Sequence, residues 1–334
     1  MRARKAGTAA LAGLALAVTA SGCSGDGRPA AEAPPSIPPP PIAVIPAPAS
    51  ADGLSLPLEA YLLTPEQNAT VERAQSMLTA DCMRRFGFSY PVAGARGLSA
   101  ARETVNWLFL PERTAARWGY HQSPERRAEI QRAQEGGNGA DLSSAAKAVM
   151  TGTAASYRGA AVPKGGCFSL GRDGVEAGAA KIKLPAWADR ADQKLPPGAP
   201  PSMRLASQQP SFLPETLLDG AFKYAQADAR MKKVEASWSA CMKQAGHAYP
   251  NLDAVLRDRR WEGGDGPSAA EIATAQADAR CRARVNYAGT MYALQVAYQK
   301  ALIDQNAEAL AQVRSTNETM VRNAAKVLNG GPAS

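Results

Sequence analysis

The strongest constraint on the fold is a ten-residue motif that the chain contains twice. Residues 82–91 read Cys-Met-Arg-Arg-Phe-Gly-Phe-Ser-Tyr-Pro, and residues 241–250 read Cys-Met-Lys-Gln-Ala-Gly-His-Ala-Tyr-Pro. Both fit Cys-Met-x-x-x-Gly-x-x-Tyr-Pro, and in each a basic residue follows the methionine. Five identities at the same spacing indicate an internal repeat, so we take the two copies as equivalent parts of two related modules.

The residues that lead into the first copy predict an amphipathic helix that ends at the glycine of the motif. Thr64-Pro65-Glu66-Gln67 supplies an N-cap, a proline in the first turn and a capping-box glutamine. Apolar residues then recur at steps of three and four, at Val71, Ala74, Leu78, Cys82 and Phe86. Gly87 would stop this helix, and the chain would continue extended into Tyr90-Pro91. The second copy predicts the same arrangement around Trp238, Cys241, Met242 and Gly246, so we interpret the motif as architecture.

The five cysteines divide into one near the N-terminus and four in the two modules. In an exported protein, Cys82, Cys167, Cys241 and Cys281 favour two disulfides, for which the sequence alone allows three connectivities. The repeat favours one of them, because each copy of the motif is followed by one further cysteine. We therefore predict the pairs Cys82–Cys167 and Cys241–Cys281. No C-x-x-C spacing occurs, so the cysteines do not indicate a zinc or thioredoxin-like redox site.

The N-terminus predicts export. Residues 1–22 contain three basic residues near the start and then an apolar stretch of about fifteen residues, too short for a membrane span of roughly 20. The end of this stretch, Ala20-Ser21-Gly22-Cys23, resembles a bacterial lipobox, which implies that Cys23 is acylated and becomes the first mature residue. Ala20 stands where lipoboxes usually carry leucine, so cleavage by an ordinary signal peptidase and plain secretion are the alternative.

Two proline-rich segments divide the rest of the chain. Residues 23–57 contain ten prolines, which predicts an extended tether that packs no core and holds the following residues away from the membrane. Residues 181–211 form a second proline-rich linker or surface loop. These segments define the predicted modules, one at residues 58–180 and one at residues 212–330.

The fold class predicted is mainly α, because no window alternates apolar and polar residues as a half-buried strand does. A capping box at Ser268 is followed by no proline until Pro332, which predicts about sixty helical residues. They would form one long helix, bent at Gly289, or a helical hairpin. A weak heptad seam runs from Ile303 to Val327, and it favours packing within the module over oligomerisation.

Charge and histidine content exclude several functions. Of the formal net charge of +8, three positive charges lie in residues 1–22, which hold no acidic residue, so the remaining chain carries +5. This charge is dispersed over the chain and does not indicate a nucleic-acid face. The two histidines, His121 and His247, have no metal-ligand companions nearby in the sequence. With no phosphate-binding glycine loop either, we predict no metal and no cofactor.

No catalytic residue is assigned. Ser144-Ala145-Ala146-Lys147 fits the S-x-x-K pattern of penicillin-binding proteins, but no Lys-Thr-Gly accompanies it, and a two-residue match arises readily by chance. Glu112 is a lone carboxylate that cannot by itself indicate a glycosidase. The richest aromatic cluster would be core, or a partly exposed groove for a peptide or glycan. It consists of Trp107, Phe109, Trp118 and Tyr120.

The cysteine segments resemble a family of uncharacterised actinobacterial lipoproteins. The resemblance covers most of residues 58–328. It lies in Trp238-Ser239-Ala240-Cys241-Met242-x-x-x-Gly246, Ala277-Asp278-x-x-Cys281, Pro163-Lys164-Gly165-Gly166-Cys167 and the segment from Leu302 to Arg314. It implies export and this cysteine pattern, but no activity.

The sequence thus predicts a lipoprotein anchored through Cys23 to the extracytoplasmic face of the cell membrane. We expect a non-catalytic binding or scaffolding role, with an envelope protein or cell-wall polymer as partner. A first alternative is a cell-wall hydrolase or acyltransferase. A second is the solute-binding subunit of a transporter, which would require alternating βα units around a hinge.

Overall fold

A computed structural model describes residues 36–92, 100–135, 142–179, 182–183, 212–263 and 266–331. The predicted signal, the lipobox with Cys23, and most of the linker at 181–211 lie outside these residues. The described part contains twelve α-helices and one short hairpin, which confirms the mainly α fold class.

The first seven helices in chain order are α1 (Pro65–Arg85), α2 (Ala100–Asn106), α3 (Glu112–Trp118), α4 (Pro124–Glu135), α5 (Ser144–Thr151), α6 (Gly166–Val175) and α8 (Leu213–Ala227). The other five are α9 (Ala229–Gln244), α10 (Leu252–Leu256), α11 (Ala269–Arg284), α12 (Tyr287–Gln305) and α13 (Ala307–Leu328). Two 3-10 helices, η1 (Pro57–Tyr61) and η4 (Arg259–Trp261), add single turns. The hairpin consists of β1 (Ser156–Tyr157) and β2 (Ala160–Ala161), with Ser156 opposite Ala161.

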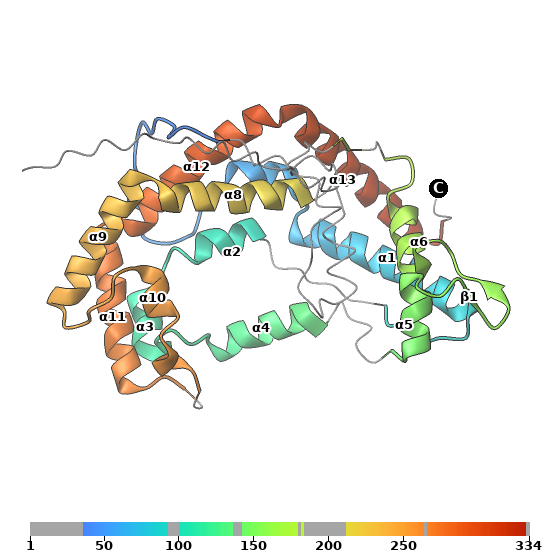
Figure 1. Ribbon diagram of the computed structural model, residues 1–334, viewed down its shortest axis with the longest axis horizontal. Coiled ribbons are helices and arrows are strands. Elements are labelled where there is room, and N and C mark those ends of the chain that lie inside the picture. Colours follow the sequence, from blue (N-terminus) through green and yellow to red (C-terminus); the bar gives the residue numbers. More distant parts are fainter. Residues whose placement is uncertain are drawn as a thin grey trace, which may run out of the picture.

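Helices α11, α12 and α13 follow one another in an arc along the molecule (Figure 1). The predicted single long helix or hairpin is therefore wrong: the chain breaks twice, and Gly289 lies inside α12. At the first break Asn286 has a φ of 52°, a left-handed conformation that asparagine tolerates better than most residues. At the second, Asn306 caps its own helix end, where its Nδ2 donates to the carbonyl of Leu302 at 2.8 Å.

Both copies of the repeated motif end their helix in the same way. In α1 the N–H of Phe88 donates to the carbonyl of Met83 at 3.1 Å, and in α9 the N–H of His247 donates to that of Met242 at 2.9 Å. Gly87 and Gly246 occupy the left-handed region that such a helix stop requires, with φ of 79° and 87°. The interpretation of the repeat as a helix-ending device is confirmed.

The two predicted disulfides are both present. Cys82 pairs with Cys167 on α6, and Cys241 pairs with Cys281 on α11, with Cα–Cα distances of 5.5 and 5.7 Å. In each pair the motif cysteine is buried on the last turns of its helix. Each bond therefore fastens a motif helix to a helix further along the chain.

Packing also runs between the two predicted modules. Helix α3 packs on α11, and α1, which also packs on α6 of its own module, packs on α13. The face of α13 that carries the predicted heptad seam is buried here, with Leu310, Val313 and Ala324 inaccessible to solvent. Asn317 on this face donates to the carbonyl of Tyr61 at 3.0 Å. The seam therefore packs within its own chain, but mainly on α1 of the other predicted module and not within its own module as expected.

The proline-rich segment differs from the expected spacer over residues 36–57. It has no helix before Pro57, but it lies against the helices (Figure 1), and Ile37, Ala51 and Leu56 are buried in the largest apolar cluster. That cluster also contains residues of α2, α8, α9, α11, α12 and α13. A segment without backbone pairing can still contribute to a core where its occasional large apolar side chains meet an apolar surface.

Candidate functional site

The densest group of buried polar side chains lies along one face of α11. Glu271, Thr274, Asp278 and Arg282 follow each other at steps of three or four residues, so they share this face. Glu271 and Asp278 are only 1% and 0% exposed. Since a buried charge is costly unless it is paired and hydrogen-bonded, each must find partners inside the protein.

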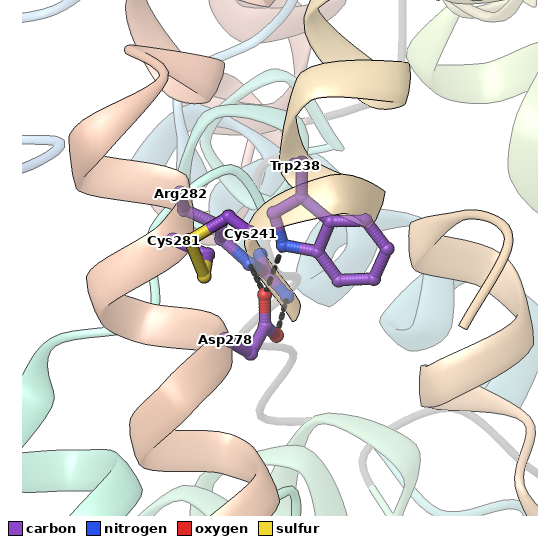
Figure 2. Close-up of a disulfide and its surroundings, with 5 residues drawn as sticks. All are labelled: Trp238, Cys241, Asp278, Cys281 and Arg282. Atoms are coloured by element: carbon purple, nitrogen blue, oxygen red, sulfur yellow. Dashed lines mark hydrogen bonds and ion pairs between the residues drawn. A yellow bond between two sulfur atoms is a disulfide. The ribbon is translucent and has the colours of Figure 1, made fainter. Parts of the chain in front are cut away.

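Asp278 finds them in three side chains, of which Figure 2 shows Trp238 and Arg282. Its Oδ1 accepts from the indole Nε1 of Trp238 at 2.8 Å and from Nε of Arg282 at 2.9 Å. Its Oδ2 accepts from Nη2 of Arg282 at 2.7 Å and from the Tyr120 hydroxyl at 3.2 Å. Each of the two carboxylate oxygens thus accepts two hydrogen bonds, so the buried carboxylate is fully hydrogen-bonded within the protein.

The surroundings raise the pKa values of the two titratable partners of Asp278, Arg282 and Tyr120. Burial opposes the guanidinium charge, but the Asp278 carboxylate outweighs burial and raises the pKa of Arg282. Burial, and then the nearby Asp278 charge, raise the pKa of Tyr120, so its hydroxyl stays protonated. The cluster is therefore one fixed ion pair with neutral hydrogen-bond donors around it.

This cluster adjoins the second disulfide. Cys281 lies three residues after Asp278 on α11, and Cys241 lies three residues after Trp238 on α9 (Figure 2). Helices α9 and α11 are thus joined by a covalent bond and by a hydrogen bond within one turn of each other.

Glu271, two turns earlier, holds the turn that follows α3. Its Oε1 accepts from the backbone N–H of Tyr120 at 2.7 Å and lies 2.8 Å from Nδ1 of His121. Gly119 sits directly over this carboxylate with a φ of 56°, and a Cβ there would come within 2.5 Å of Oε1. The absence of a side chain at Gly119 is what allows the turn to close on Glu271.

Both histidines contact α11. His247 Nδ1 lies 3.0 Å from the hydroxyl of Thr274, and His121 Nδ1 lies 2.8 Å from Oε1 of Glu271. Both histidines thus have a side-chain partner on this helix.

The four aromatic residues of the predicted groove contact different parts of the protein. Trp107 is 38% exposed and meets Phe222 of α8 edge-on, with centroids 5.5 Å apart. Tyr120 lies 5.9 Å from the ring of Trp261 and bonds to Asp278. Phe109 packs on the main apolar cluster, and Trp118 carries the guanidinium of Arg117 at 5.0 Å. A shared groove formed by these residues stays a prediction.

The weak catalytic candidates lie on the surface. Ser144 and Lys147 are exposed at the start of α5, where the N-cap is Ser143 and not Ser144. Glu112 is exposed and forms an ion pair with Arg280 at 3.3 Å.

A second polar cluster joins α9 and α12. The Arg230 guanidinium donates to both oxygens of Asp228, at 2.9 and 2.7 Å, and Asp228 also accepts from the Tyr298 hydroxyl at 2.9 Å. Hydrogen bonds from Arg230 outweigh burial and lower the pKa of Asp228 to about 2. The remaining Nη1 of Arg230 donates to the carbonyl of Pro40 at 3.0 Å, so this cluster reaches the proline-rich segment.

Sequence reasoning missed both clusters. The signal for the first is the spacing Glu271, Thr274, Asp278, Arg282, because charged residues at helical steps on a face bordered by alanines indicate a polar stripe. No comparable signal exists for the second cluster, because Arg230 meets Pro40 from 190 residues away and Asp228 meets Tyr298 from 70 residues away.

Neither a metal nor a membrane span is indicated by the described part of the chain. Within it, no three His, Cys, Asp or Glu side chains are placed together to hold a metal ion. None of its helices combines the length and the apolar character needed to cross a bilayer. No protein-family model, curated protein or solved structure matches the chain.

Proposed function

We propose that this chain is an exported lipoprotein, anchored by acylated Cys23 to the outer face of the cell membrane, that acts as a non-catalytic binding or scaffolding protein. Two features support export. The lipobox-like segment ends in Cys23, and the mature chain holds two buried disulfides, which persist in oxidising compartments.

The observation that carries the non-catalytic part is how the acid–base groups are used. Asp278 accepts four hydrogen bonds from its own chain, and Glu271 is shielded beneath the Tyr120–His121 turn. A general acid or base must reach a substrate atom at hydrogen-bond distance. These side chains instead hold helices together, which favours a rigid body that presents a surface.

The anchor is tested by comparing the natural chain with Cys23→Ala in the cells that export it. We expect the natural chain in the membrane fraction, with an N-terminal peptide that starts at Cys23 and carries the mass of acyl chains. Cys23→Ala should leave the membrane fraction. An unacylated N-terminus and equal fractionation of both forms would contradict the anchor.

The role is tested by cross-linking on intact cells, followed by identification of what is joined to the chain. We expect an envelope protein or wall polymer whose cross-link is lost when Cys23→Ala releases the protein. As a test of the hydrolase alternative, purified protein is incubated with cell-wall material beside a Ser144→Ala variant. Wall cleavage by the natural chain that Ser144→Ala abolishes would contradict a non-catalytic role.

A further inference from the structure

The proline-rich segment is held by side chains that donate to its backbone carbonyls. We call residues 36–52 the strap. Arg230 donates to Pro40, Asn286 Nδ2 donates to Pro46 at 2.9 Å, and Arg102 Nη1 donates to Ala51 at 2.8 Å. A proline has no N–H, so the six prolines of the strap offer only their carbonyls as backbone hydrogen-bonding groups. Arg102 on α2, Arg230 on α9 and Asn286 at the start of α12 each donate to one of the carbonyls of the strap.

The surface is shaped for close approach of a backbone. A Cβ on Gly289 would lie 1.9 Å from the carbonyl oxygen of Pro46, so only glycine leaves room for the strap at this point of α12. Glycine is unfavourable in the interior of a helix, and Gly289 lies in the first turn of α12, where another residue would otherwise serve better. An added Cβ would also come within 2.4 Å of Oδ1 of Asn286, so the glycine leaves room both for the strap and for the side chain that donates to it.

The first turn of the strap alternates in exposure with a step of three residues. Ile37 is buried and Pro40, three residues later, is half-buried, while Pro38, Pro39 and Pro41 are exposed. Three residues per turn is the period of the polyproline helix. Val44, at the outer bend, is 77% exposed.

The donor Arg230 is held in place by contacts that do not involve the strap. The guanidinium of Arg230 is held by both oxygens of Asp228, which in turn is held by Tyr298. A donor with a fixed direction loses little freedom on binding. None of these three contacts involves the strap.

We propose that the face formed by Arg102, Arg230, Asn286 and Gly289 is a receptor site for an extended proline-rich segment, and that the strap of the same chain occupies it as a displaceable intramolecular ligand. The recognition is of the kind that proline-rich peptides meet in other domains, a preformed extended backbone on a prepared surface. It does not depend on acylation of Cys23.

The test cuts the strap from the folded protein. A protease recognition sequence is inserted between Asp52 and Gly53, an exposed turn with open space around Gly53. After cleavage, Leu56 and η1 stay attached to the helices. We expect the strap peptide to dissociate on dilution, while the helical circular dichroism and both disulfides are retained. A labelled peptide of residues 36–52 should then bind saturably, and unlabelled peptide should compete.

A matched pair of glycine variants identifies the site. Gly289→Ala should weaken binding of the labelled peptide at least tenfold, because its Cβ occupies the position of the Pro46 carbonyl oxygen. Gly220→Ala, inside α8 with nothing within 4 Å of its added Cβ, should bind like the parent. In the uncut chain, Gly289→Ala should also speed proteolysis within the strap, and Gly220→Ala should not. A peptide whose prolines are replaced by alanine should bind at least tenfold more weakly.

Four results would overturn the proposal. These are unfolding of the cut protein when the strap leaves, a strap that never exchanges with labelled peptide, equal binding by the two glycine variants, and equal binding of the proline-free peptide. A dimer of the uncut chain that Gly289→Ala disperses would overturn the intramolecular assignment, since the strap of a second copy would then be the occupant.

Discussion

Asp278 and Arg282 form a fully buried ion pair within one helix, and their environment explains why such a pair is tolerated. Each Asp278 oxygen accepts two hydrogen bonds, so the cost of removing the charges from water is offset by charge-assisted bonds with good geometry. Replacing one member alone would leave the other charge without its partner.

Asp278→Asn should therefore lower the free energy of unfolding by roughly 3–5 kcal/mol, because Arg282 would be left buried and unpaired. The measurement is urea denaturation at neutral pH. The control is Asp253→Asn, which breaks an ion pair of the same i,i+4 spacing with Arg257 on the surface. Such an exposed pair is worth about 0–1 kcal/mol, so equal losses in the two variants would contradict the prediction.

Glu215 in the first turn of α8 shows the opposite situation, a largely buried carboxyl group that has no cation beside it among the described residues. Burial raises its pKa from 4.5 to about 7, and its Oε2 has no hydrogen-bond partner among the described residues. The folded state thus keeps its proton at pH values where the unfolded state has lost it. Stability contributed by the protonated form is therefore present below pH 4.5 and is lost as pH rises toward 7.

Glu215→Gln should remove this pH-dependent loss of stability. We expect the variant to be more stable than the parent at pH 8 by at most roughly 3 kcal/mol, with little difference at pH 4. Denaturation midpoints across this pH range measure it, with Glu66→Gln as control because Glu66 also follows a proline in a first helical turn but is exposed. A stability difference that does not change with pH would count against the prediction.

At the scale of elements, the repeated motif forms the C-terminal stop of a helix. Met83 and Met242 are fully buried and accept the capping hydrogen bond at their carbonyls, and the glycine that follows turns the chain away. The same hydrogen bond and the same left-handed glycine end α1 and α9, although the helices packed around them differ.

The two glycines should consequently respond alike to substitution. Gly87→Ala and Gly246→Ala should each lower the free energy of unfolding by about 1–2 kcal/mol, because a left-handed residue with a Cβ is strained. Gly220→Ala, in a regular helix, should raise it by up to about 1 kcal/mol. Thermal unfolding of the three variants measures this, and a loss confined to one copy would show that the copies are not equivalent.

At the scale of the whole molecule, the two disulfides hold distant segments. Cys82–Cys167 spans 85 residues and Cys241–Cys281 spans 40 residues. The first fastens α1 to α6, and the second fastens α9 to α11 beside the Asp278 cluster.

Replacing both cysteines of either pair by alanine should lower the free energy of unfolding by about 2–5 kcal/mol, slightly more for the longer loop. Chemical denaturation of the two double variants measures the effect. Non-reducing peptide mapping provides the independent check, since a peptide that joins Cys82 to Cys241 would contradict the pairing.

Local signals explain what the sequence determined. Thr64 caps α1 through the N–H of Gln67, Gly87 ends that helix, and the repeat assigned the cysteine pairs correctly. Each of these signals acts within a turn of its own residue or through an internal comparison of the chain, so it can be read without knowing the fold.

The tertiary structure alone decided the rest. The break at Asn286, the docking of the strap on Gly289, and the enclosure of Glu271 by Gly119 and Tyr120 join residues up to 243 positions apart. Whether a glycine admits a backbone or a carboxylate finds its donors depends on which surfaces meet. That choice is made by the packing of all the helices together, and no window of the sequence contains it.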